Sequence, residues 1–173
     1  MASVTRLFDE TAIAHRVGEL AGEIAAALPR EFLIVGLLKG SFVFMADLIR
    51  ALDRAGATPT VDFLRLSSYG HERRSSGVVR VIGDAPKDVA GRAVLVVDDI
   101  VDTGRSLVFA RDLLAEAGAA SVSTCALLDK PSRREVEIAA DFVGFTVDDV
   151  FVVGYGIDDA EKYRHLPYIG AVD

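Results

Sequence analysis

Apolar residues recur along this chain in two patterns, one typical of amphipathic helices and the other of buried strands. The segment 9–28 shows the first pattern, with apolar side chains at helical spacing: Ile13, Val17, Leu20 and Ile24. Asp9 precedes the run as a candidate N-cap, and Pro29 follows it. This combination predicts an amphipathic helix.

Short continuous apolar runs show the second pattern and alternate with further helical stretches. We expect strands at 32–38, 61–66, 78–82, 93–97 and 122–128, and helices at 42–55 and 104–117, the last of which ends at Gly118. The run 93–97 is the most apolar and β-branched, so we place it at the centre of the sheet. Strands that alternate with helices predict an α/β fold, a mainly parallel twisted sheet with helices on both faces.

Two stretches depart from this alternation. Residues 67–77 are polar, contain Gly70 and Gly77 and lack apolar anchors, so we expect a long mobile loop there. Beyond Lys130, the short apolar segments 142–145 and 151–154 flank an acidic turn, and we expect them to form a small hood beside the sheet. Residues 1–173 would then form a single domain, with a hood made mainly by residues 131–173.

The composition narrows the classes of function. With 173 residues, 51% of them hydrophobic, the chain has enough apolar surface for the core of one ordinary domain. A net charge of -7 argues against a surface that holds nucleic acid. The only cysteine, Cys125, lies in an apolar run and is predicted to be a buried strand thiol. No apolar run approaches the roughly 20 residues that span a bilayer, so we expect no membrane partner and a cytoplasmic location.

The strongest chemical signal lies at 94–107, where an apolar strand ends in Asp98 and Asp99 and a small polar turn opens a helix. Backbone N–H groups at 103–106 would point at a phosphate from the helix N-terminus. The hydroxyls of Thr103 and Ser106 would add donors, and Gly104 would permit close approach. Taken alone this pattern is weak evidence, because an acidic residue before a helix is more often a simple cap.

The same segment resembles the phosphoribosyl pyrophosphate motif of type I phosphoribosyltransferases: four apolar residues, two acids, two apolar residues, then Asp-Thr-Gly at 102–104. The loop 38–41, Leu-Lys-Gly-Ser, is similar to the pyrophosphate loop of the hypoxanthine-guanine branch. Lys130 and the segments 141–145 and 151–156 extend the resemblance over nearly the whole chain. The resemblance implies transfer of the 5-phosphoribosyl group from phosphoribosyl pyrophosphate to hypoxanthine or guanine, Mg²⁺ as cofactor, and a homodimer or homotetramer.

The resemblance also implies the roles of individual residues. Phosphoribosyl pyrophosphate would bind to Leu38, Lys39, Gly40, Asp98, Asp99, Asp102, Thr103, Gly104, Arg105, Ser106 and Arg164, with a non-proline cis peptide at Leu38-Lys39. The 6-oxopurine would bind to Lys130, Phe151, Val152 and Asp158, and the metal to Asp98, Asp99 and Asp158. Ser68 and Tyr69 would belong to a catalytic loop that closes over the reacting centre. Asp102 is the candidate base for the purine N7 proton.

Some features leave alternatives open. Asp148 stands where relatives commonly carry proline, and Asp159 where an aromatic residue is common, so the hood would differ slightly in shape. A xanthine or broad 6-oxopurine transferase is one alternative. Another is a non-catalytic regulator that senses phosphoribosyl pyrophosphate and binds nucleic acid, but such a protein should show a basic face. The three histidines have no spacing that would build a metal cage.

Overall fold

The structure is a computed structural model that describes residues 2–68 and 78–173. Its elements, in chain order, are β1 (Val4–Phe8), α1 (Glu10–Ala27), β2 (Leu33–Leu38), α2 (Phe42–Arg54), β3 (Thr60–Ser68), β4 (Val79–Ile82), β5 (Ala93–Val101), α3 (Arg105–Glu116), β6 (Ser121–Asp129), the 3-10 turn η1 (Pro131–Arg133), β7 (Phe142–Thr146), β8 (Val152–Val153) and β9 (Ile169–Val172). The helices predicted at 9–28, 42–55 and 104–117 are confirmed to within one or two residues.

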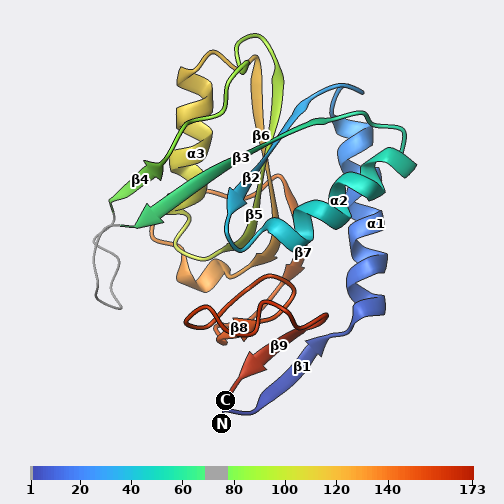
Figure 1. Cartoon of the computed structure of the whole chain (residues 1–173), viewed down its shortest axis with the longest axis vertical. Helices are drawn as coiled ribbons and strands as arrows, with labels where there is room; N and C mark the ends of the chain where they lie inside the picture. The colour runs from blue at the N-terminus through green and yellow to red at the C-terminus, as the bar shows by residue number, and fades with distance from the viewer. Residues whose placement is uncertain (1, 69–77) are drawn as a thin grey trace.

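The main sheet has six strands in the order β4-β3-β2-β5-β6-β7 (Figure 1). All neighbouring pairs are parallel except β3 and β4, where the chain returns antiparallel along the edge. The segment expected at the centre, β5, lies between β2 and β6. The predicted α/β fold with a mainly parallel sheet is therefore confirmed.

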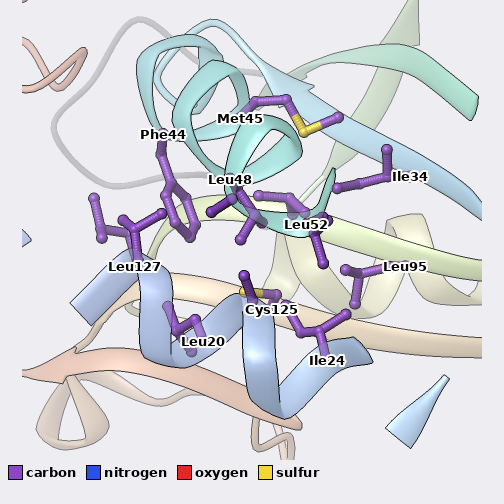
Figure 2. Close-up of a cluster of buried hydrophobic side chains, with 14 of the residues drawn as sticks. Leu20, Ile24, Ile34, Phe44, Met45, Leu48, Leu52, Leu95, Cys125 and Leu127 are labelled. Atoms are coloured by element: carbon purple, nitrogen blue, oxygen red, sulfur yellow. The ribbon is translucent and has the colours of Figure 1, made fainter. Parts of the chain in front are cut away.

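Two apolar cores hold helices against opposite faces of this sheet. On one face, side chains of α1 and α2 pack against alternate residues of β2, β5 and β6, and Figure 2 shows Leu20, Phe44, Leu48 and Leu95 meeting there. On the other face, α3 covers the intervening residues of the same strands. Because both faces are buried, the strands are continuously apolar, which is why their runs were visible in the sequence.

Local signals determine where several elements begin and end. Asp9 caps α1, since its carboxylate accepts a hydrogen bond of 2.8 Å from the backbone N–H of Ala12. Gly118 follows α3 with a φ of 92°, a left-handed conformation that glycine adopts without steric cost. The central strand runs further than the apolar run predicted, because its parallel ladder with β6 continues as far as the pair Val101 and Asp129. Asp98 and Asp99 therefore lie within β5 rather than after it.

The prediction that residues 142–145 belong to a hood is wrong. This segment is β7, the sixth strand of the main sheet, parallel to β6. Phe142 and Phe145 pack against the core beneath α1, and Phe145 stacks on Phe8 with ring centroids 4.0 Å apart. Burial of these aromatic rings favours a place in the sheet, and the sequence showed the apolar residues without showing which surface they cover.

A second, three-stranded antiparallel sheet has the order β1-β9-β8 and brings the two ends of the chain together (Figure 1). We call this sheet, with the segment 154–168 that joins β8 to β9, the hood. Its strand β1 was not predicted, because most of its residues are exposed and show no apolar period. The hydroxyl of Tyr155 donates to Asp47 and so links the hood to α2. That residues 1–173 form one domain stays a prediction.

Among the helices in the described part of the chain, none has both the length and the apolar character needed to cross a membrane.

Arg16 joins α1 to β7, since its guanidinium donates to the backbone carbonyls of Val143 and Gly144 at 2.6 and 2.8 Å. We predict that Arg16→Met, which keeps the aliphatic stem, lowers the free energy of unfolding by about 2 kcal/mol, the usual contribution of hydrogen bonds from a charged donor. Urea denaturation measures this value. Arg111→Met is the control, because exposed Arg111 pairs with the adjacent Asp112 on the same helix, and it should change the free energy by less than about 0.5 kcal/mol.

Candidate active site

The candidate site lies where the chain leaves two neighbouring parallel strands in opposite directions. From β2 the chain continues into α2 on one face of the sheet, and from β5 it continues into α3 on the other. Such a reversal opens a crevice outside the carboxyl ends of the strands. A pocket of about 270 Å³ lies here, lined by the loop after β2, the end of β5, the start of α3 and two hood residues, Asp158 and Arg164.

Two adjacent carboxylates at the end of β5 form the floor of this pocket. Asp98 is only 8% exposed, and its carboxylate accepts the N–H of Asp99 at 2.9 Å. The carboxylate of Asp99 accepts the N–H of Ile100 at 2.8 Å. Burial raises the pKa of Asp98 well above its ordinary value, and the charge of Asp99 raises it further. Burial also raises the pKa of Asp99, although its hydrogen bonds and the charge of Arg164 oppose this shift.

The loop after β2 packs directly on these acids. A Cβ on Gly40 would lie 1.8 Å from an Asp99 carboxylate oxygen, so only glycine fits there. A Cβ on Gly156 of the hood would in turn lie 2.8 Å from the carbonyl oxygen of Gly40. The buried hydroxyl of Ser41 donates to the carbonyl of Leu37 at 2.6 Å and closes the turn. The cis peptide expected at Leu38-Lys39 is present.

The turn between β5 and α3 forms the opposite wall of the pocket. The carboxylate of Asp102 accepts the N–H of Thr103 at 2.6 Å, and Gly104 has a φ of 86°. A Cβ on Gly104 would lie 2.5 Å from the side chain of Ile138, so glycine is required by the approach of the protein's own chain. The guanidinium of Arg105 does not line the pocket and instead pairs with Glu135 at 2.8 Å.

A second pocket of about 330 Å³ adjoins the first and shares four lining residues with it: Asp99, Ile100, Asp102 and Asp158. Its other walls include Lys130, Phe151 and Val152. The Lys130 ammonium donates to the carbonyl of Val150 at 2.6 Å, and burial lowers the pKa of Lys130, with the charge of Arg133 adding to the effect. Phe151 is 54% exposed, which leaves this residue open to a ligand.

The backbone of Val152 faces away from its neighbouring strand. Val172 N–H donates to the carbonyl of Phe151, the residue before β8, at 2.8 Å, so positions 151 and 172 lie at a hydrogen-bonding position of the antiparallel ladder that continues between β8 and β9. In such a ladder the adjacent pair, Val152 and Ala171, is not hydrogen-bonded. The N–H and C=O of Val152 therefore point to the open edge of β8, where they suit the edge of a planar ligand.

The hood supplies a cation, Arg164, to the first pocket, which Lys39 also lines. Arg164 donates to the carbonyl of Gly156 at 2.7 Å and pairs with Asp158 at 3.2 Å. Its Nε is buried and has no hydrogen-bond partner among the described residues. Asp158 also accepts the N–H of Glu161 at 2.8 Å. The site thus presents carboxylates at its floor, an arginine at one wall and an open aromatic ring beside it.

Comparisons with known proteins agree with this arrangement. Residues 3–160 match the phosphoribosyl transferase domain. The chain belongs to the phosphoribosyl transferase family. It is 44% identical to the hypoxanthine phosphoribosyltransferase of Salmonella typhimurium, over 98% of this chain and 96% of that one. It is 46% identical to the hypoxanthine-guanine phosphoribosyltransferase of Bacillus subtilis, over 96% and 91%. A solved hypoxanthine-guanine phosphoribosyltransferase from Bacillus anthracis superposes with a TM-score of 0.91 at 41% identity, over 99% and 100%.

The structure brings most of the predicted site residues of this phosphoribosyl transferase chain together. The first pocket is lined by Leu38, Lys39, Gly40, Asp98, Asp99, Asp102, Gly104, Ser106, Asp158 and Arg164. Lys130, Phe151 and Val152 line the second pocket. Thr103 and Arg105 line neither, although the hydroxyl of Thr103 accepts the N–H of Arg105 at 3.3 Å inside the same turn. Ser68 is the last residue of β3, and Tyr69 and the rest of the predicted loop to Gly77 lie outside the described residues.

Sequence reasoning missed residues that hold the site in place. Arg134 donates to the carbonyl of Asp102 at 2.9 Å and pairs with Asp129 at 2.5 Å, so it supports the turn from behind. Glu161 contacts Lys39 and Arg164. No periodic or spacing signal marks Arg134, whereas Glu161 lies beside Asp158 in a segment that the resemblance covered.

The carboxylates suit a magnesium ion that arrives with its substrate. Within residues 2–68 and 78–173, no three acidic, histidine or cysteine side chains form a ready metal cage. Mg²⁺ commonly binds through one or two carboxylates, several waters and the phosphate oxygens of a substrate. Asp98, Asp99 and Asp158 line one pocket and supply hard oxygen ligands of this kind. The donor set therefore fits the ion, with Asp158 remaining partly engaged by Arg164.

Burial of charged Asp98 should destabilise the ligand-free protein at neutral pH. The folded-state pKa of Asp98 is raised, so the protonated side chain is favoured in the folded protein. The stability that Asp98 contributes is therefore fully present below its unfolded-state pKa and is lost as the pH rises. We predict that Asp98→Asn, measured with a chelator, raises the free energy of unfolding at pH 7 by at least about 1 kcal/mol. The gain should shrink as the pH falls toward about 4. A gain that is independent of pH would contradict this explanation.

Proposed function

We propose that this chain transfers the 5-phosphoribosyl group of phosphoribosyl pyrophosphate to hypoxanthine or guanine, giving IMP or GMP and pyrophosphate, in purine salvage. The observation that carries the proposal is the pair of adjoining pockets, which share Asp99, Ile100, Asp102 and Asp158. The first is polar and suits a sugar phosphate, and the second has an open aromatic ring and suits a flat base. The reacting carbon of the ribose would lie at their junction.

Binding of phosphoribosyl pyrophosphate would use every wall of the first pocket. Backbone groups of Leu38, Lys39 and Gly40, with the Arg164 guanidinium, would hold the pyrophosphate. The turn 102–106 would hold the 5-phosphate at the N-terminus of α3. Asp98 and Asp99 would bind the ribose hydroxyls and Mg²⁺, with Asp158 as a further metal ligand. Bound Mg²⁺ would neutralise charge that develops on the leaving pyrophosphate.

The second pocket would hold the purine by three different interactions. The Lys130 ammonium keeps two further N–H donors beyond the one used by Val150, and one of these would donate to the 6-oxygen of the base. Phe151 would stack on the purine face. The backbone of Val152, which points to the open strand edge, would hydrogen-bond the edge of the base. These contacts would recognise the 6-oxo group and the flat shape of the base, which xanthine shares with hypoxanthine and guanine. Xanthine is therefore the alternative substrate to test.

Asp102 is the group that we assign as general base. Asp102 lines both pockets, and its carboxylate would accept the N7 proton of a purine bound at their junction. Displacement of pyrophosphate would proceed through a ribose carbon with oxocarbenium character, by analogy with glycoside chemistry. Exclusion of water from that carbon is the role that we propose for Ser68 and Tyr69.

The remaining expectations follow from family membership. We propose Mg²⁺ as the cofactor, phosphoribosyl pyrophosphate and a 6-oxopurine as the small-molecule partners, and a homodimer or homotetramer in the cytoplasm. Incubation of the purified chain with MgCl₂, phosphoribosyl pyrophosphate and hypoxanthine, guanine or xanthine tests the reaction, with the nucleotides separated by chromatography. We expect IMP and GMP. Formation of xanthosine nucleotide alone would support the xanthine enzyme, and binding without turnover would support a regulator.

Removal of the Lys130 ammonium should affect the base and spare the sugar phosphate. We predict that Lys130→Met raises the KM for hypoxanthine about 10- to 100-fold, the effect of losing one hydrogen bond from a charged donor. The KM for phosphoribosyl pyrophosphate should change less than about twofold, a difference of roughly 0.4 kcal/mol. Arg133→Met is the matched control, because Arg133 lies at the same rim but pairs with Asp149. Equal losses toward both substrates would place Lys130 outside base recognition.

Loss of the Asp102 carboxylate should slow the chemical step. We predict that Asp102→Asn lowers the single-turnover rate with hypoxanthine by roughly 10²- to 10⁴-fold, the usual contribution of a positioned general base. The amide oxygen can still accept the N–H of Thr103, so the turn and phosphoribosyl pyrophosphate binding should persist. Rapid-quench measurement is needed because product release can hide a change in chemistry. An unchanged rate would show that Asp102 only caps the turn.

A further inference from the structure

Glu161, which no site assignment includes, is held by two cations of the sugar-phosphate pocket. One carboxylate oxygen accepts the Lys39 ammonium at 3.1 Å, and the other accepts Nη2 of Arg164 at 3.2 Å. Both cations line the pocket assigned to phosphoribosyl pyrophosphate. One carboxylate thus occupies donors on two separate walls, the loop after β2 and the hood.

The ion pair between Glu161 and Lys39 is expected to contribute little to the stability of the fold. The side chains of Glu161 and Lys39 are 65% and 48% exposed, and exposed pairs contribute little to stability because solvent screens them. Hydrogen bonds from Lys39 and then Arg164 lower the pKa of Glu161, so the carboxylate is charged. The pair can therefore open readily while it still presents a full negative charge.

The backbone directs Glu161 toward these cations. Its φ is 65°, and the neighbouring Ala160 and Tyr163 also have positive φ, at 49° and 73°. Non-glycine residues adopt this left-handed conformation rarely, and they keep it where the surrounding structure holds them there. The N–H of Glu161 donates to Asp158, which anchors the turn beside the pocket.

We propose that Glu161 is an internal competitor of pyrophosphate. In the free protein its carboxylate engages Lys39 and Arg164, and a diphosphate must displace it to reach the same donors. Glu161 therefore acts through these two residues to weaken binding of phosphoribosyl pyrophosphate and of the product pyrophosphate. Weaker product binding hastens release, a step that often limits turnover. The inference rests on the proposed function, because that function assigns pyrophosphate to this wall.

The test is calorimetric titration of inorganic pyrophosphate with MgCl₂ into the whole protein and into Glu161→Gln, which keeps the shape and removes the charge. We expect the variant to bind roughly threefold to tenfold more tightly, the combined effect of two exposed ion pairs. The KM for phosphoribosyl pyrophosphate should fall in parallel, while the KM for hypoxanthine stays constant. If Glu161 only supported the structure of the site, its substitution would not tighten pyrophosphate binding. Tighter binding by the variant therefore indicates competition.

Glu19→Gln is the matched control. It makes the same change in net charge on an exposed carboxylate of α1, where Glu19 contacts His15 and Arg16, and pyrophosphate affinity should not change. Added salt should reduce the difference between the unchanged protein and Glu161→Gln, since screening weakens the competing pairs. Equal or weaker pyrophosphate binding by Glu161→Gln would overturn the inference. Pyrophosphate binding without nucleotide formation in the assay above would refute the proposed function alone, and nucleotide formation without pyrophosphate binding in either protein would overturn the inference alone.

Discussion

The site depends on one close stack of three groups from distant parts of the chain: the Asp99 carboxylate, the backbone of Gly40 and the backbone of Gly156. Each glycine lacks the Cβ that would collide with the next group in the stack. The contact lets the loop after β2 lie on the end of the central strand and lets the hood lie on that loop. Arg164 and Asp158 reach the pocket only because the hood approaches this closely.

This stack explains why two acids remain buried at the end of β5. Isolated buried carboxylates are costly, and the raised pKa values of Asp98 and Asp99 express that cost. The neighbouring N–H groups and the charge of Arg164 offset only part of it. A cation that enters with a diphosphate would supply the missing compensation. The ligand-free site is therefore arranged for a charge that its own residues do not carry.

The parts of the fold that sequence could predict are those whose residues respond to local burial. Continuous apolar runs marked β2, β5 and β6 because both faces of these strands are covered. The strand β1 was not predicted, because its own side chains are mostly exposed. It is stabilised by pairing with β9, from the other end of the chain. The place of β7 in the main sheet likewise depends on Phe8 and α1, so its own residues could not determine it.

The predicted site residues were found mainly through family resemblance, and their supporting contacts were not. Arg134 acts on Asp102 through a backbone carbonyl, and any residue type could occupy the carbonyl side of that bond. The proposed role of Glu161 likewise depends on contact between the hood and Lys39, which only the tertiary structure reveals. Residue identity can suggest which groups perform chemistry, but the partners that hold them emerge only when distant segments meet.

Lys39, Lys130 and Arg164 each already have a hydrogen-bond partner in the ligand-free protein, so a ligand either takes a remaining donor or displaces an existing partner. The acceptors are of two kinds. Lys130 donates to the carbonyl of Val150 and Arg164 to the carbonyl of Gly156, and these neutral partners do not offset the charge of the cation. Asp158 and Glu161 instead bring negative charge to Arg164, and in our proposal a diphosphate displaces Glu161. A carbonyl partner therefore orients a cation without offsetting its charge, whereas the carboxylate of Glu161 would, in our proposal, weaken the attraction of the cations for pyrophosphate. In the proposed reaction the same pyrophosphate group is part of the substrate and then the product, so a carboxylate partner would limit affinity at both stages.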